Sequence, residues 1–342
     1  MGWRKPINGL RNKLEKNMQN KKTNNFRNIL PYYIDFVIPG FEKSYPKGTF
    51  KCLSFTEQAS EKWFFEFLNK VKNAIGKKFL PIYRMSDGEF QFCVGYRYPL
   101  RAANEPLWLY SLRTLRRWIK KMCFKLSDRQ FSAGGKGYIS AQYQASELKF
   151  LRNQYAEQLK QIAQQGILAI HFTDRINSPQ KKQFQQQYFL PISRWFNKHN
   201  IQLNEKNYYP FYFVYALLTG PYRHKIYKNR HILVITSYDK NKHEATTKGL
   251  INEGVKSVQF INLSKGRSMY DKINLSSIKK PIDIVLVGAG IGASNILCQL
   301  ESLNTVTIDA GYIIECLTNP GRKKQRTFCW PDNERNGNYH PI

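Results

Sequence analysis

The sequence has 342 residues, and its 54 Lys and Arg residues against 24 Asp and Glu give a formal net charge of +30. A content of 42% hydrophobic and 14% aromatic residues excludes a chain that is disordered throughout, and the length suits one large α/β domain or two small ones. The charge predicts anionic partners. The six cysteines have no metal-binding spacing, and neither a membrane span nor a signal sequence is evident, so we expect a cytoplasmic protein.

Residues 1–53 predict a basic N-terminal tail followed by an extended, aromatic-rich lead-in. The apolar residues of the tail recur at three- and four-residue spacing, and they are Trp3, Ile7, Leu10, Leu14 and Met18. Apolar residues at this spacing in a basic field are typical of a helix that lies peripherally on an anionic membrane. A frayed basic tail explains the same residues equally well.

A predicted helix over about 56–75 and a buried strand over 80–84 open the core, and the strand ends at Arg84-Met-Ser-Asp87-Gly-Glu89. Loops at the carboxyl ends of strands hold the ligands of open α/β sheets. If this loop is extended, Asp87 and Glu89 can both face one divalent cation, and Arg84 can bind a phosphate. A tight Asp-Gly turn with a surface ion pair is the alternative.

The middle of the chain predicts helices over 104–126 and 144–165, and a buried strand over 166–172. The first helix has an apolar and a basic face, which suits either packing on the core or binding of an acceptor phosphate or anionic lipid. The aromatic region 180–225 is expected to be helical. Its rings either line an acceptor cleft or pack in the core.

The last hundred residues alternate strands at 231–237, 257–261, 282–287 and 305–308 with helices at 242–252 and 294–303. This alternation predicts a Rossmann-like, doubly wound α/β fold, with a mostly parallel sheet and helices on both faces. The polar loops that follow these strands carry Ser237, Lys265, Arg267, Gly288, Gly290, Gly292 and Asp309. They are expected to face one ligand crevice.

The segment Gly288-x-Gly290-x-x-Ala293 matches the relaxed dinucleotide fingerprint, with Asp309 about 20 residues further on. It predicts an enzyme that uses NAD or S-adenosylmethionine and binds a ribose hydroxyl through Asp309. The chain is too short after this loop for the remaining strands of a dinucleotide domain. The alternative is a loop that holds the phosphates or ribose of a nucleotide sugar.

The segment Ile82–Phe90 resembles the Arg-Tyr/Phe-Gly-Asp-Gly-Glu-Phe/Leu signature of GT-D-type glycosyltransferases, a family first known as a domain of unknown function. The segments Asp283–Gly290 and Thr305–Tyr312 are similar to the closing strand, helix and Asp-x-Gly-His motif of that family. Two positions depart from the family: Met85-Ser86 replaces its aromatic and glycine, and Tyr312 replaces its histidine.

The resemblance implies one GT-D-like catalytic domain over 54–318, with halves at 54–175 and 229–318, a helical and aromatic insert at 176–228, and a basic tail at 319–342. It implies transfer of a sugar from a nucleotide-diphosphate sugar, with a UDP-sugar favoured. The acceptor would be a glycan, a glycoprotein or a lipid-linked molecule, as in polysaccharide biosynthesis.

In that mechanism Asp87 and Glu89 are the metal ligands and would hold Mn²⁺ or Mg²⁺ on the diphosphate. The expected donor-binding residues are Arg84, Ser86, Gly88, Ser237, Lys265, Arg267, Gly288, Gly290 and Gly292. Asp309, Glu244 and His243 are candidates for the catalytic base. A non-catalytic polyanion-binding protein is a third class, but no nucleic-acid-binding motif is present and the basic residues are spread along the chain, so nucleic acid is not an expected partner.

Overall fold

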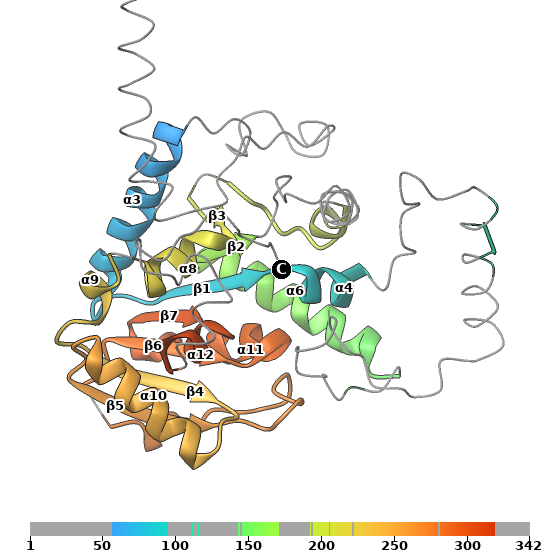
Figure 1. Cartoon of the computed structure of the whole chain (residues 1–342). Helices are drawn as coiled ribbons and strands as arrows, with labels where there is room; N and C mark the ends of the chain where they lie inside the picture. The colour runs from blue at the N-terminus through green and yellow to red at the C-terminus, as the bar shows by residue number, and fades with distance from the viewer. Residues whose placement is uncertain are drawn as a thin grey trace, which may run out of the picture.

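The computed structural model describes residues 57–94, 146–170, 194–204, 206–220, 222–279 and 281–318, together with the single residues 108, 111, 112, 115, 143 and 192. The expectations for the N-terminal tail, for most of the helix at 104–126 and for the C-terminal tail lie outside these residues. Figure 1 shows the described elements as one sheet with helices packed against it.

Among the described residues, seven strands form the sheet, and every pair of neighbours is parallel. The strands are β1 (Leu80–Met85), β2 (Ile167–Ile170), β3 (Tyr208–Pro210), β4 (His231–Thr236), β5 (Ser257–Asn262), β6 (Ile284–Gly288) and β7 (Val306–Asp309). Their order across the sheet is β3-β2-β1-β7-β6-β4-β5. The predicted Rossmann-like α/β fold is therefore confirmed, with the sheet wholly parallel in the part of the chain that the structure describes.

The last strand, β7, lies in the middle of the sheet. On one side Ile308 pairs with Ile82 of β1, and on the other side it pairs with Leu286 of β6. The strands β3, β2 and β1 are thus joined to β6, β4 and β5 through β7 alone. This placement brings the loops after β1 and β7 together, although more than 200 residues separate them in the sequence.

Helices cover both faces of the sheet. They are α3 (Glu57–Ala74), α4 (Asp87–Val94), α6 (Leu148–Gln165), α8 (Phe211–Thr219), α9 (His224–Tyr227), α10 (Lys240–Asn252), α11 (Ala293–Cys298) and α12 (Ile313–Thr318), with short 3-10 helices η1 (Leu275–Ser277), η2 (Gly290–Gly292) and η3 (Glu301–Leu303). None of the described helices is long and apolar enough to cross a membrane.

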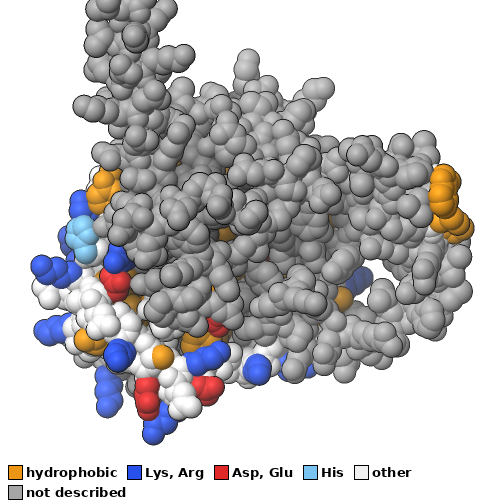
Figure 2. All heavy atoms as spheres, viewed as in Figure 1, with side chains coloured by type: hydrophobic (Ala, Val, Ile, Leu, Met, Phe, Trp, Pro, Cys, Tyr) orange, Lys and Arg blue, Asp and Glu red, His pale blue; other side chains and the backbone are white. Residues whose placement is uncertain are grey.

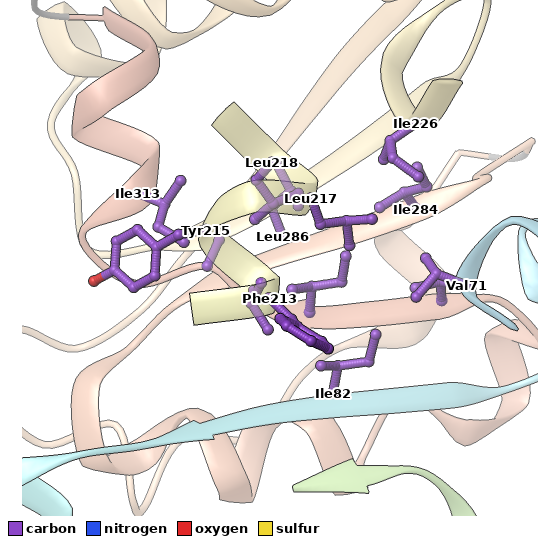
Figure 3. Packing of buried hydrophobic residues seen from close by; sticks show 14 of the residues in the cluster. Val71, Ile82, Phe213, Tyr215, Leu217, Leu218, Ile226, Ile284, Leu286 and Ile313 are labelled. Atoms are coloured by element: carbon purple, nitrogen blue, oxygen red, sulfur yellow. The ribbon is translucent and has the colours of Figure 1, made fainter. Parts of the chain in front are cut away.

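Two apolar cores result, because successive residues of a strand point to opposite faces. Tyr83 of β1 packs with α4, α6 and α11, whereas Ile82 packs with α3, α8 and α12. Figure 3 shows part of the second core, where Phe213 and Leu217 of α8 lie over the strands and Val71 comes from α3. The two cores make a rigid platform for the loops at the strand ends.

Most predicted elements are confirmed to within a few residues, and three differ. The region 180–225 was expected to be helical, but it also holds β3, a three-residue edge strand. The helix predicted at 294–303 ends at Cys298 and continues only as η3. The loop expected to stay extended after β1 is instead the first turn of α4, which begins at Asp87.

Four residues of the helix predicted at 104–126 are described and are helical, and three of them are apolar, namely Trp108, Leu112 and Leu115. Their exposed fractions are 63%, 54% and 50%. They do not pack in either core, so at these three positions the expectation of a core-packing face is wrong. Figure 2 shows hydrophobic side chains at the right edge of the molecule, where Figure 1 places this segment.

Candidate functional site

The carboxyl end of β1 carries Arg84 into a buried position between two elements. Only 7% of its surface is exposed, and its guanidinium lies 5.1 Å from the ring centres of both Phe211 and Tyr215 on α8. Aromatic faces attract a cation, and they do so more strongly where water is excluded. The side chain is thus held within the protein, and little of it is open to a ligand.

Asp309, at the carboxyl end of β7, is the ionic partner of Arg84. The Arg84 Nη2 atom lies 3.6 Å from Asp309 Oδ1, the Arg84 backbone N–H donates to Oδ2 at 3.3 Å, and the Arg84 Nε donates to the Asp309 carbonyl. Gly311 permits this approach, since a Cβ there would lie 2.2 Å from Arg84 Nη2, and its φ of +45° favours glycine. The pair fastens β1 to β7 at the ligand edge of the sheet.

Burial disfavours the charged forms of Arg84 and Asp309, whereas their ion pair favours those charged forms. Burial raises the pKa of Asp309, and the ion pair and hydrogen bonds from Arg84 counter the rise. Burial alone would lower the pKa of Arg84, but Asp309, Tyr215 and Glu89 together raise it above its ordinary value. Asp309 Oδ1 accepts no hydrogen bond from any described residue.

Glu89 lies in the first turn of α4 and closes half of a capping box. Its Oε2 atom accepts the Ser86 backbone N–H at 2.9 Å and the Ser86 hydroxyl at 3.3 Å. Burial raises the pKa of Glu89 to about 7, and the charge of nearby Asp309 adds to the rise. We call Arg84, Glu89 and Asp309 the charged corner.

The helical geometry changes the expected relation between Asp87 and Glu89. Residues two apart on a helix point about 200° away from each other, because each residue turns the helix by about 100°. Two carboxylates at these positions therefore do not face one cation as they would in an extended loop. The side chain of Asp87 lies outside the described part, and Gly88 is buried within the turn.

The glycine loop after β6 is packed against its surroundings at two of its three glycines. A Cβ on Gly288 would lie 3.1 Å from Ile314 Cδ1 and 3.2 Å from Thr236 Oγ1, and a Cβ on Gly292 would lie 2.1 Å from Ser268 Oγ. Gly290 has φ +53° and open space beside it. A backbone can approach a phosphate at Gly290, whereas Ser268 fills the space beside Gly292.

Two features disfavour the dinucleotide reading of the fingerprint. The acidic residue expected to bind a ribose is Asp309, which is held by Arg84. The helix that follows, α11, has six residues.

The loop after β5 carries Lys265 and Arg267 on its exposed surface. Arg267 Nη2 lies 3.0 Å from Glu147 Oε1, just before α6, and the guanidinium lies 5.0 Å from the ring centre of Tyr270. Lys265 is exposed and makes no ion pair with another described residue. Of the two predicted cations, Lys265 is therefore the one with its charge unpaired within the described chain.

Ser237 and the two remaining base candidates lie on the β4 and β5 side of the sheet. Ser237 follows β4 and is partly buried, close to Asp239, whose side chain caps α10 by accepting the Lys242 N–H at 2.9 Å. His243 stacks on Phe260 of the edge strand β5, with ring centres 4.1 Å apart. Glu244 lines a surface groove together with His243 and Phe260.

The structure thus brings Arg84, Glu89 and Asp309 together and leaves His243 and Glu244 at the far edge of the sheet. Sequence reasoning missed Phe211 and Tyr215, which hold Arg84, and Ser268, which fills the glycine loop. The spacing of four between Phe211 and Tyr215 places both on one helix face, but it carries no signal of their partner. Among the described residues, no group of three or more His, Cys, Asp or Glu side chains could hold a metal ion.

An all-parallel sheet with helices on both faces defines an α/β protein, and the charged corner lies at the carboxyl edge of that sheet. A family model described as the GT-D fold-like domain matches residues 151–317. The matched stretch includes Asp283–Gly290 and Thr305–Tyr312, so the resemblance found in the sequence is confirmed there. The segment Ile82–Phe90 precedes the matched residues.

Two solved structures are similar to 73% of this chain over 82% of their own length, at 13% and 12% sequence identity and a TM-score of 0.39 each. One is a selenomethionine-substituted structure of domain of unknown function 1792, and the other is described as that domain with a distinct glycosyltransferase fold. No curated protein matches the sequence.

Proposed function

We propose that this protein is a glycosyltransferase that moves a sugar from a nucleotide-diphosphate sugar to a glycan, a glycoprotein or a lipid-linked acceptor, with a UDP-sugar as the favoured donor. The observation that carries the proposal is the charged corner at the carboxyl edge of the sheet, in a chain whose residues 151–317 match the GT-D fold-like domain. Such an edge is where open α/β sheets bind their ligands.

We assign the divalent cation, Mn²⁺ or Mg²⁺, to the side of the charged corner at Glu89. Burial and the charge of Asp309 raise the pKa of Glu89 to about 7, so a cation beside Glu89 would stabilise its charged form. Asp87 precedes Glu89 in the same helical turn, and carboxylate oxygens are the ligands that these cations prefer.

When bound, the cation would act as a Lewis acid on the departing diphosphate. Arg84, held by Phe211 and Tyr215, keeps Asp309 in place instead of contacting the donor. Lys265 offers its unpaired charge to the phosphates, and the open space at Gly290 lets the backbone approach them.

Asp309 is the catalytic base that this arrangement favours among the three candidates. Its Oδ1 atom is free of hydrogen bonds within the described residues, and its raised pKa strengthens it as a proton acceptor. His243, by contrast, is stacked on Phe260 at the outer edge of the sheet. In an inverting mechanism, the oxygen of the acceptor hydroxyl would attack the sugar carbon as its proton passes to Asp309, and the bond from that carbon to the diphosphate oxygen would break, which releases the nucleoside diphosphate.

The test is a panel of nucleotide sugars incubated with Mn²⁺ or Mg²⁺, scored by donor hydrolysis and by thermal stabilisation. We expect Asp87→Asn and Glu89→Gln each to lower turnover at least 100-fold, whereas Glu301→Gln, a change of an exposed carboxylate, should leave it unchanged. If the parent protein turned over no nucleotide sugar and were instead stabilised by NAD or S-adenosylmethionine, the fingerprint reading would replace this one.

Contact with an anionic membrane would suit a lipid-linked acceptor. The net charge of +30 attracts anionic lipids, and Trp108, Leu112 and Leu115 expose apolar surface at helical spacing. We expect the full chain to float with vesicles that contain phosphatidylglycerol, and both deletion of residues 1–28 and the change Leu112→Asp to reduce that recovery. Equal recovery with neutral and anionic vesicles would contradict membrane contact through charge.

A further inference from the structure

The loop from Leu263 to Asp271 lies between β5 and β6 and is held by groups from outside itself. Within the loop, Asp271 Oδ2 accepts the Ser264 N–H at 2.8 Å, which closes its base, and Gly266 has φ +77° at its tip. These contacts alone cannot fix nine residues, because ordering each residue costs about 1–2 kcal/mol of conformational entropy. The supports of the loop therefore come from its neighbours.

Asn295 on α11 is the central support. It is 5% exposed, and its Nδ2 group donates to the Ser268 carbonyl at 3.0 Å and to the Asp271 carbonyl at 2.9 Å. One turn further along, Gln299 Nε2 donates to the same Asp271 carbonyl at 3.0 Å. We call Asn295 and Gln299 the amide clamp.

The helix α6 orients the clamp from behind. Gln158, itself buried, accepts the Ser294 hydroxyl at 2.7 Å and places its Nε2 3.5 Å from Asn295 Oδ1. Buried amides that have their partners satisfied hold one geometry, since any other arrangement leaves a polar group unpaired. Asn295 thus meets the loop in a fixed orientation.

The loop is also locked onto the glycine loop. The Ser268 hydroxyl donates to the Ala289 carbonyl at 2.8 Å, and Gly292 lies so close that a Cβ there would meet Ser268. On the outer side, the Met269 N–H donates to the Tyr143 hydroxyl at 3.0 Å, and Tyr270 donates to Glu147 at 2.6 Å. The exposed residues at the tip, including Lys265, are the part left to meet a ligand.

We propose that Asn295 is a positioning residue for donor binding: it fixes the loop 263–271 so that Lys265 meets the phosphates of a nucleoside diphosphate beside Gly290. This inference rests on the proposed function. A loop that is ordered before the ligand arrives does not pay the ordering cost on binding. The clamp therefore acts on donor affinity through Lys265, without touching the donor.

The chain offers a matched control in Asn207, which is 6% exposed and whose Nδ2 donates to two backbone carbonyls at 2.8 and 2.9 Å. It lies before β3, at the opposite, amino-terminal edge of the sheet. Asn207→Ala removes the same chemical group as Asn295→Ala and leaves the loop alone. A purely structural role of Asn295 would make the two variants behave alike.

The first measurement is hydrogen exchange of the unliganded full chain. We expect Asn295→Ala to speed exchange across residues 263–271 at least 10-fold, while Asn207→Ala leaves these residues unchanged. Unchanged exchange of the loop in Asn295→Ala would overturn the clamp. This result does not depend on whether the protein is a glycosyltransferase.

The second measurement is calorimetric binding of UDP in the presence of Mn²⁺. We expect Asn295→Ala to weaken binding about 10-fold and Asn207→Ala less than 2-fold. In the background of Lys265→Ala, adding Asn295→Ala should cause no further loss, since the clamp acts through Lys265. Additive losses, or equal losses in the two asparagine variants, would overturn the inference; absence of binding by the parent to every nucleoside diphosphate tried would overturn the proposed function and the ligand assignment with it.

Discussion

The charged corner and the amide clamp hold neighbouring loops at the carboxyl edge of the sheet by different kinds of interaction. In the charged corner, the guanidinium of Arg84 and the carboxylates of Glu89 and Asp309 hold one another, so each charged group depends on its partners for compensation of its charge. In the amide clamp, neutral side chains satisfy backbone carbonyls of a loop. Loss of an ionic partner should therefore threaten the fold, whereas loss of an amide should mainly release one loop.

The sharpest way to break the comparison is Arg84→Met, which leaves Asp309 buried without its counter-charge. We expect a loss of roughly 3–5 kcal/mol in the free energy of unfolding, measured by urea denaturation. The matched control is Arg223→Met, which removes a part-exposed ion pair to Glu253 with an N–O distance of 2.8 Å and should cost about 1 kcal/mol or less. Equal losses would mean that the corner is not held by its charges.

A steric change tests the other region. Gly292→Ala places a Cβ 2.1 Å from Ser268 Oγ and 2.6 Å from the Ser268 carbonyl carbon, so the loop must shift. We expect a loss of about 2–3 kcal/mol with faster hydrogen exchange in the loop. Gly290→Asn is the control, because open space surrounds Gly290 and asparagine tolerates positive φ. If Gly292→Ala left loop exchange unchanged, the contact would not position the loop.

The pH dependence of stability distinguishes the charged corner from the neutral clamp. The folded-state pKa of Glu89 is about 7 against an ordinary value of 4.5, so the folded protein binds more protons between these values than the unfolded chain. Metal-free protein should therefore lose stability as pH rises from 4.5 to 7, by roughly 3 kcal/mol, and level off above pH 7. Glu89→Gln should remove this contribution, whereas Asn295→Ala should keep it.

The smallest expected effect on stability belongs to Lys265→Gln. The side chain is exposed and makes no ion pair with other described residues, so the free energy of unfolding should change by less than about 0.5 kcal/mol. Binding of UDP should nonetheless weaken and become less sensitive to salt, because a charge that meets the phosphates is lost. Unchanged salt dependence would remove Lys265 from the phosphate site.

The sequence predicted the charged corner better than the clamp, for a physical reason. Arg84, Glu89 and Asp309 follow apolar runs that read as buried parallel strands, and the carboxyl ends of such strands meet at one edge. The helical turn at Asp87 was missed, although Ser86 and Glu89 stand three apart as in a capping box. An extended loop was expected because only that conformation lets Asp87 and Glu89 face one divalent cation.

The sequence around Asn295 and Gln299 did not indicate the amide clamp. Asn295 and Gln299 have the spacing of neighbours on a helix, but nothing local indicates that they bind a loop more than 20 residues earlier. Likewise, the sequence predicts Gly292 as a donor-binding residue, and only the tertiary contact with Ser268 shows what fills its space. Contacts of this kind depend on where two segments meet in space, which pattern and propensity do not encode.

The position of β7 has a consequence for the order in which the molecule can form. Of the strands that the structure describes, β7 is the last to be synthesised, yet it alone bridges β3-β2-β1 and β6-β4-β5. Until residues 306–309 arrive, β1 and β6 each present an unpaired apolar edge, which invites intermolecular pairing. A nascent chain that stalls before this strand would have two half-sheets that are not yet joined. Folding is therefore expected to be slow, because it depends on contacts between segments far apart in the sequence. Until synthesis is complete, we expect the chain to bind chaperones.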